Sequence, residues 1–219
     1  MHASARKTYS AAFYRRQQAG SRRSAKAVLP LVFQAVKPQS VVDVGCGVGT
    51  WLGTARELGA VRLAGYEGSW VKSAGYDSSI EIREANLEHP LPVDEQFDLA
   101  ICMEVAEHIS PARSAGLVDD LTALAPNVLF GAAIPGQGGT GHVNEKWQSE
   151  WAELFARKGY GARDIVRPKV WWKGGVEFWY RQNAILYSRG APIVPTDRLK
   201  RVHPVMRALW MLRLTRYER

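Results

Sequence analysis

The sequence predicts an α/β fold with a mainly parallel sheet, on the evidence of two patterns and of its length. Short runs rich in Val, Ile, Leu and Phe alternate with stretches of helical spacing, which is typical of strand–helix–strand units. A glycine-rich turn follows the first of these runs, and 219 residues suffice for one domain with a buried core. We expect strands near 41–44, 62–67, 80–84, 97–103, 127–133, 160–167 and 182–188, and helices near 25–36, 50–59, 69–74, 112–125 and 147–158.

The glycine-rich turn is the strongest sign of a ligand. The first expected strand runs into Gly45, Gly47 and Gly49, where the missing Cβ atoms let the backbone approach a ligand closely. Backbone N–H groups at the start of the next helix favour a nucleotide-like cofactor there. Asp43 lies at the strand end, where open α/β sheets bind ligands. Thr50 stands where a dinucleotide fingerprint has its last glycine, and no P-loop sequence is present. A tight turn without a ligand is the alternative interpretation.

A carboxylate follows the second expected strand. Glu67 stands at the tip of that strand, 24 residues after Asp43. In this position a carboxylate can accept hydrogen bonds from both ribose hydroxyls of an adenosine. A solvated surface acid is the alternative. The fourth expected strand ends in Met103 and Glu104, with His108 shortly after, so these side chains would meet at the same carboxyl edge of the sheet.

Several of these segments resemble a known family. The Asp-x-Gly-x-Gly-x-Gly order at residues 43–49 resembles motif I of class I S-adenosylmethionine-dependent methyltransferases. Asn86-Leu87 stands where that family often has an Asp-Leu pair that contacts the adenine, and here an amide replaces the carboxylate. Further segments resemble one small bacterial group of these enzymes over residues 14–188: Glu-Val-Ala-Glu-His, Ala-Ala-Ile-Pro-Gly-Gln, Gly-His-Val-Asn-Glu-Lys-Trp and Trp-Tyr-Arg-Gln-Asn.

The resemblance has consequences for fold, cofactor and site. It implies a Rossmann-like three-layer sandwich whose seven-stranded sheet is mainly parallel, with one antiparallel strand. It implies S-adenosylmethionine as the cofactor and S-adenosylhomocysteine as the product. The cofactor-binding residues implied in this chain are Asp43, Gly45, Cys46, Gly47, Gly49, Glu67, Gly68, Asn86, Leu87, Met103 and Glu104.

The segment after the fifth expected strand, residues 133–145, is the most distinctive candidate for chemistry. Its glycines favour a mobile loop that binds substrate or acts as a lid at the carboxyl edge of the sheet. His142 is the best candidate general base, because imidazole titrates near neutral pH, and His108 is the second candidate. In the alternative interpretation His142 only anchors the loop, and Asn144 caps a helix that starts at Glu145. His108 would then cap the helix that follows Pro111.

Metal binding is not required by any spacing in the sequence. Glu104, Glu107, His108 and His142 could together hold a divalent cation, but their pattern does not compel one, so we predict no metal site. The two cysteines lack a metal-type spacing and stand at the ends of expected strands, so we expect a reduced, cytoplasmic protein.

The implied reaction is O-methylation of a small-molecule or glycan-type hydroxyl by in-line methyl transfer, with a histidine as general base. An aromatic-rich insertion at residues 168–181 would cover the acceptor; alternatively, it forms a local hydrophobic cluster. Two other functions stay open. One is a nucleic-acid methyltransferase, acting on RNA, that grips phosphates with its basic ends. The other is a non-catalytic scaffold protein that binds S-adenosylmethionine.

The net charge of +8 is concentrated at the two ends of the chain. Residues 1–42 hold 8 basic and no acidic residues, and residues 189–219 hold 8 basic and 2 acidic residues, so the central part is acidic. An acidic body argues against a phosphate-tracking groove through the active site. We expect a basic N-terminal helical segment over 1–40, a cofactor-binding domain over 41–188, and a basic C-terminal arm and helix over 189–219.

The last segment, residues 204–217, has the composition of a helix that begins at a proline. It could dock on its own domain, form part of a homodimer, or lie on an anionic membrane surface, because Trp210 and the arginines around it favour the interface. The chain has no apolar run of transmembrane length. We therefore expect a cytoplasmic protein, with peripheral membrane association as an alternative.

Overall fold

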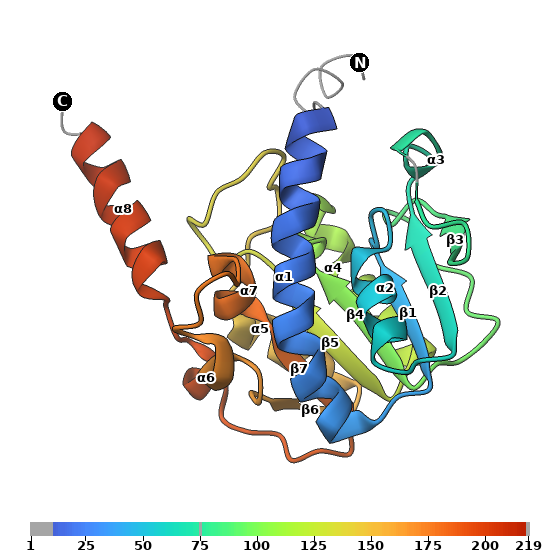
Figure 1. Ribbon diagram of the computed structural model, residues 1–219. Helices are drawn as coiled ribbons and strands as arrows, with labels where there is room; N and C mark the ends of the chain where they lie inside the picture. Colours follow the sequence, from blue (N-terminus) through green and yellow to red (C-terminus); the bar gives the residue numbers. More distant parts are fainter. Residues whose placement is uncertain (1–10, 75, 218–219) are drawn as a thin grey trace.

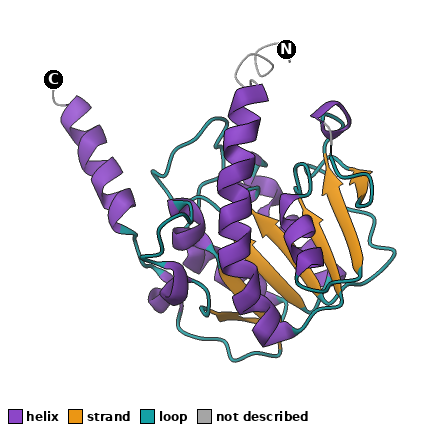
Figure 2. Cartoon of the chain, in the orientation of Figure 1, coloured by secondary structure: helices purple, strands orange, loops and turns teal. Residues whose placement is uncertain are grey.

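The computed structural model describes residues 11–74 and 76–217. Residues 1–10 of the predicted basic N-terminal segment and residues 218–219 of the C-terminal arm lie outside this description. Seven strands form one sheet in the order β3-β2-β1-β4-β5-β7-β6, with helices on both faces (Figures 1 and 2). The strands are β1 (Ser40–Val44), β2 (Arg62–Glu67), β3 (Glu81–Glu84), β4 (Leu99–Met103), β5 (Asn127–Gly131), β6 (Tyr160–Arg163) and β7 (Ile185–Arg189).

The strand directions confirm the predicted sheet. Strands β1 to β5 pair in parallel with their neighbours. Strand β7 pairs antiparallel with both β5 and β6, so it is the one antiparallel strand of the sheet. Strand order reverses beside β1, which lies between β2 and β4. In open α/β sheets this switch point is where the carboxyl ends of the strands form a crevice.

One face of the sheet is covered by α1 (Ala11–Val36) and α2 (Thr50–Glu57), which lie in front of it in Figure 1. The buried residues of α1 are Ala25, Val28, Leu29 and Val32, a spacing that places them on one stripe of a helix. They pack with residues of α2 and with the apolar side chains of β1 and β4. The other face is covered by α4 (Ser114–Leu124) and α5 (Gln148–Arg157).

The second core contains most of the aromatic packing. Phe130 of β5 lies against Trp151 of α5, with 5.0 Å between the ring centroids. Phe155 stacks on Tyr187 of β7 at 4.0 Å and 12°. All four side chains are almost completely buried. These contacts fix α5 over the junction of β5 and β7.

Three elements differ clearly from the prediction. The helix expected over 25–36 begins at Ala11 and is 26 residues long. The strand expected over 160–167 ends at Arg163, and α6 (Arg167–Val170) begins where Pro168 stands in the first turn of a helix. The strand expected over 182–188 begins only at Ile185, because the preceding residues belong to α7 (Phe178–Asn183). The short helix expected over 69–74 is α3 (Val71–Ala74).

The C-terminal arm docks on its own domain before α8 (Pro204–Tyr217) begins. His203 and Met206 are buried, and Nε2 of His203 contacts the carbonyl oxygen of Trp171 at 2.8 Å. The Trp210 ring lies 6.2 Å from the Trp147 ring, so α8 passes beside the loop that precedes α5. Beyond this point α8 extends away from the sheet (Figure 1), and Met211 is 67% exposed. No helix in the described part of the chain is long and apolar enough to cross a membrane.

Candidate active site

The glycine-rich turn joins β1 to α2 through three residues with positive φ. Gly45 has φ 78°, and a Cβ atom there would overlap the side chain of Val105. Gly47 has φ 55°, but a Cβ atom there would meet nothing within 4 Å. Both positions need a left-handed backbone that glycine adopts without cost. Gly45 is therefore required by packing as well, whereas Gly47 faces open space at the edge of the sheet.

Glu67, at the tip of β2, is tied to this turn. Its Oε2 accepts a hydrogen bond from the N–H of Gly47 at 2.8 Å. Its Oε1 accepts hydrogen bonds from the N–H of Gly68 at 2.8 Å and from the indole of Trp70 at 3.0 Å. The pKa of Asp43 in β1 is raised well above its ordinary value by burial and then by the charge of Glu67. The structure thus brings the predicted residues of β1, β2 and the turn together at one edge.

The remaining predicted cofactor residues lie along the same edge. Asn86 follows β3 and is exposed, with Oδ1 accepting a hydrogen bond from the N–H of Glu88 at 3.1 Å. Leu87 is half-buried and packs on the core. Cys46 is a buried free thiol whose pKa is raised by burial, and Met103 is buried at the end of β4. Their contacts with a cofactor stay a prediction.

Glu104 is the centre of a polar cluster that the sequence does not reveal. Its carboxylate accepts hydrogen bonds from Asn183 Nδ2 at 2.9 Å and from Gln137 Nε2 at 3.0 Å, and Asn183 Nδ2 also donates to Gln137 Oε1 at 3.1 Å. Burial raises the pKa of Glu104 to about 7. Glu104 has φ 59°, an uncommon backbone conformation for a non-glycine residue and one that is often found at functional sites.

Gln137 and Asn183 are thus functional candidates that sequence reasoning missed. A signal was present, because both stand in segments that carry the family resemblance, Ala-Ala-Ile-Pro-Gly-Gln and Trp-Tyr-Arg-Gln-Asn. Nothing in the sequence indicates that they meet at Glu104, because that contact depends on β7 returning beside β5.

The two candidate catalytic histidines lie together. The His108 and His142 rings are 4.9 Å apart at 85°, an edge-to-face pair. Nδ1 of His142 lies 3.0 Å from Oε1 of Glu145, and Nδ1 of His108 lies 3.4 Å from the carbonyl oxygen of Gly141. Burial and the neighbouring His142 lower the pKa of His108, so this ring is neutral at pH 7.

Glu145 fixes the loop from which His142 projects. Besides His142, its carboxylate accepts hydrogen bonds from the N–H groups of Gly136 at 2.8 Å and Gly138 at 2.7 Å. Burial alone would raise the pKa of Glu145, but these three hydrogen bonds outweigh it and lower the pKa. Glu145 is therefore ionised at neutral pH, and it holds both the backbone of the loop and the imidazole ring.

Two capping roles in the alternative interpretation are wrong. Helix α5 begins at Gln148, three residues later than that interpretation requires, and its N-terminus is capped by Glu150 Oε2, which accepts from the N–H of Trp147. Asn144 instead donates across the site to the carbonyl oxygen of Ala106 at 3.1 Å. The 3₁₀ turn over Pro111–Arg113 and the helix α4 that follows it both lack a side-chain cap. His108 instead contacts the loop that contains His142.

The aromatic insertion forms, in part, a hydrophobic cluster. Tyr180 is buried and packs edge-to-face on Trp51 of α2 at 5.2 Å. Trp171 is buried against His203 of the C-terminal arm at 4.9 Å. Trp172, in contrast, is 75% exposed. The buried members agree with the local-cluster interpretation, and the role of the insertion as a wall for the acceptor stays a prediction.

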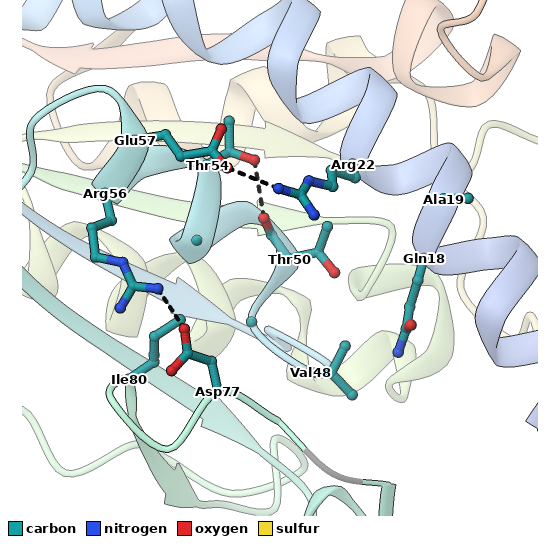
Figure 3. A pocket seen from close by; sticks show the side chains of 12 residues that line it. Gln18, Ala19, Arg22, Val48, Thr50, Thr54, Arg56, Glu57, Asp77 and Ile80 are labelled. Carbon is teal, nitrogen blue, oxygen red and sulfur yellow. Dashed lines mark hydrogen bonds and ion pairs between the residues drawn. The ribbon is translucent and has the colours of Figure 1, made fainter.

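A cavity of about 520 Å³ lies behind the glycine turn, between α1, α2 and the loop before β3 (Figure 3). Gly49 is the one predicted cofactor residue among its described lining residues. Ion pairs lie along it, Arg22 with Glu57 at 2.9 Å and Arg56 with Asp77. The cavity is therefore separate from the histidine pair and from Glu67.

A glycine turn, an acid on the next strand and a histidine pair at one edge of a mainly parallel sheet define a Rossmann-like domain with a candidate cofactor site. The profile of the Methyltransferase domain family matches residues 14–164, more than half of the chain. The chain therefore belongs to the methyltransferase domain family.

Solved structures of methyltransferases share the fold. The sugar N-methyltransferase KedS8 from Streptoalloteichus sp ATCC 53650 aligns with TM-score 0.63 and 15% identity, over 81% of this chain and 91% of that chain. The magnesium protoporphyrin IX methyltransferase ChlM from Synechocystis PCC 6803, with bound SAH, aligns with TM-score 0.56 and 17% identity, over 80% and 87%. Human N-acetylserotonin methyltransferase, in complex with SAM, aligns with TM-score 0.55 and 15% identity, over 83% of this chain but only 57% of that chain. A comparison with curated protein sequences gives no match.

Proposed function

We propose that the protein transfers a methyl group from S-adenosylmethionine to a hydroxyl of a small-molecule or glycan-type acceptor, with His142 as general base and His108 beside it. The narrower assignment to the small bacterial group with the Gly-His-Val-Asn-Glu loop is part of this proposal. The observation that carries it is the pairing of His142 with Glu145 at the sheet edge that also carries the glycine turn. The relatives described with SAM or SAH support the choice of cofactor.

The cofactor would lie along the edge formed by β1, β2 and β3. The open space at Gly47 leaves room for a ligand against the backbone, and Glu67 is held at its side by the N–H of the same glycine. In this proposal the Glu67 carboxylate accepts hydrogen bonds from the ribose hydroxyls, and Asn86 and Leu87 contact the adenine. The methionine end would then reach Met103 and Glu104, next to the histidine pair.

When bound, S-adenosylmethionine supplies a methyl group that is already activated by the sulfonium charge. The protein must therefore align the acceptor oxygen, exclude water and remove one proton. A proton on Nδ1 of His142 is stabilised by the ionised Glu145, which leaves Nε2 of the same ring as the acceptor. A base oriented by a third group in this way is a common signature of hydroxyl activation.

The basic N-terminal helix argues against the nucleic-acid alternative. Arg22 and Lys26 both pair with Glu57, at 2.9 and 3.0 Å, and Arg23 pairs with Glu177 at 3.4 Å. Cations that are neutralised within the protein release fewer counterions when a nucleic acid binds. Three cations of α1 thus share two carboxylates, so these ion pairs lower the positive charge that the helix presents to phosphate groups.

The test combines turnover with cofactor binding. The protein is incubated with S-adenosylmethionine and a panel of sugar and phenol hydroxyls, and release of S-adenosylhomocysteine is measured. His142→Ala should lower turnover by about 10²- to 10⁴-fold, because it removes the base, whereas calorimetric affinity for S-adenosylhomocysteine should stay close to wild type. His89→Ala is the matched control, since His89 is exposed and outside the cluster.

Three results would overturn the proposal in different ways. Unchanged turnover in His142→Ala removes that residue as the base. Tight cofactor binding without turnover on any acceptor supports the scaffold alternative instead. Methylation of RNA, together with RNA binding that weakens steeply with salt, supports the nucleic-acid alternative.

A further inference from the structure

We propose that Glu107, His108 and His142 form a binding site for one divalent first-row transition-metal cation. One ligand atom from each of the three residues lies within 4.8 Å of the other two. Two imidazole nitrogens and one carboxylate oxygen are a ligand set that suits Zn²⁺, Mn²⁺, Fe²⁺ or Co²⁺. The sequence alone predicts no metal, because no fixed spacing joins His142 to Glu107 and His108, which lie 35 and 34 residues earlier. In the folded protein the three residues lie next to one another.

Glu107 supplies independent evidence for a missing ligand. The Glu107 residue is 1% exposed, and its Oε2 atom has no hydrogen-bond partner among the described residues. A buried carboxylate oxygen without a donor is costly, because it has lost its water without replacement. A cation at this oxygen would replace the lost hydration.

The partners of the two imidazole rings fit metal ligands. In metal sites, a histidine ligand usually donates its other ring N–H to a carboxylate or to a backbone carbonyl. His142 has Glu145 Oε1 at 3.0 Å in this position, and His108 has the carbonyl oxygen of Gly141 at 3.4 Å. The first pairing leaves the lone pair of Nε2 available on His142. Glu145 is held by two backbone N–H groups, so the ring orientation is fixed before a cation arrives.

The spacing requires only a small closure of the site. Metal–ligand bonds of about 2.0–2.2 Å place ligand atoms about 3 to 4 Å apart, so atoms within 4.8 Å must approach by at most about 1 to 2 Å. Small side-chain rotations achieve this, and His108 is exposed enough to move. Three protein ligands leave coordination positions for water or an acceptor oxygen.

The role of the cation rests on the proposed function, whereas its binding does not. An acceptor hydroxyl on the cation would lose its proton more readily, because a bound cation lowers the pKa of a coordinated oxygen. His142 would then act as a metal ligand, and the base would be water or a neighbouring carboxylate. The two roles of His142 therefore differ in one measurable respect, which is whether chelation abolishes turnover.

Metal binding is tested on the full-length protein after removal of metals with EDTA, without cofactor or acceptor. Calorimetry with Mn²⁺ and Zn²⁺ should show one saturable site per chain. Glu107→Gln and His108→Asn should each weaken binding by about 10-fold or more, the scale seen when support for a metal ligand is lost. Glu153→Gln and His89→Asn are matched controls, because both residues are exposed and outside the cluster. Calorimetry with S-adenosylhomocysteine shows that each variant is folded.

Glu107 is buried, so its variant could fail to fold, and a second measurement on the wild type covers that case. Addition of Zn²⁺ should shift the side-chain ¹⁵N resonances of His108 and His142 but leave those of His89 unchanged. Absence of saturable binding, or binding that the Glu107 and His108 variants leave unaltered, overturns the site. If the metal binds at this cluster and chelation does not affect turnover, the site stands and its role in hydroxyl activation is overturned.

Discussion

Substitution of Gly45 by alanine separates two reasons for a glycine in the turn. Gly45 has φ 78°, and a Cβ atom there would overlap the side chain of Val105. Gly47 has φ 55°, but it faces open space. The two glycines thus share the backbone strain that an alanine would suffer, and only Gly45 adds a steric conflict. Gly47→Ala is therefore a matched control for Gly45→Ala.

The expected magnitudes follow from these two contributions. A left-handed conformation costs an alanine about 1–2 kcal/mol, and forcing a methyl group into a packed site costs about 1–3 kcal/mol more. Gly47→Ala should therefore lower the free energy of unfolding by about 1–2 kcal/mol, and Gly45→Ala by about 2–5 kcal/mol. The added substitution Val105→Ala removes the methyl groups in the way, so it should recover part of the difference.

Urea denaturation of the four proteins, followed by circular dichroism, measures these values. If Gly45→Ala costs no more than Gly47→Ala, the turn is not packed against Val105 as described. If Val105→Ala recovers nothing in the Gly45 variant, the conflict lies elsewhere. Calorimetry with S-adenosylhomocysteine adds an independent contrast, because a methyl group at Gly47 enters the space proposed for the cofactor and should weaken binding despite the smaller loss of stability.

Three further predictions concern single side chains. Glu67→Ala should weaken S-adenosylhomocysteine binding by about 10- to 100-fold in calorimetry, because hydrogen bonds to a charged group contribute about 1.5–3 kcal/mol each; Glu84→Ala, at the tip of the next strand, should not. Because the folded protein keeps a proton on Asp43 that the unfolded chain releases, stability should fall as pH rises above 3.8, and Asp43→Asn should flatten this profile in urea titrations. An identical profile in the variant would contradict the raised pKa. Arg167→Ala should lower the free energy of unfolding by about 3–5 kcal/mol, because the fully buried Arg167 is ion-paired and binds a carbonyl oxygen of the C-terminal arm. A loss under about 1 kcal/mol, the level of a surface ion pair, would refute that role.

The parallel core of the sheet was predictable because its signals are local. β1 is five residues of mainly β-branched character, and the turn after it is marked by glycines at alternate positions. The boundaries that failed depend on distant contacts. Gln182 and Asn183 belong to α7, and their side chains form buried hydrogen bonds with distant partners, so the strand begins only at Ile185.

Some residues of the candidate site could likewise be predicted from local sequence signals, whereas others depend on contacts between distant segments. Glu67 could be proposed because it ends an expected strand, and the two histidines because they stand in the segments that follow two other strands; strand ends meet at one edge of a parallel sheet. Gln137 and Asn183 are 46 residues apart, and they meet only because β7 runs antiparallel beside β5. No spacing in the sequence encodes that contact. The metal ligands were visible as residue types, but the missing partner of Glu107 Oε2 is a property of the folded interior alone.

The hydrogen bonds of Glu145 determine when the loop becomes ordered. A chain segment with many glycines loses much conformational entropy when it is fixed, about 1–2 kcal/mol for each residue. Because one carboxylate holds Gly136, Gly138 and His142, that cost is met when the protein folds rather than when an acceptor arrives. Acceptor binding can then be driven mainly by direct contacts, with little loss of affinity to loop ordering. Under the proposed function, a weakly recognised acceptor would thus still encounter an imidazole whose position is already fixed.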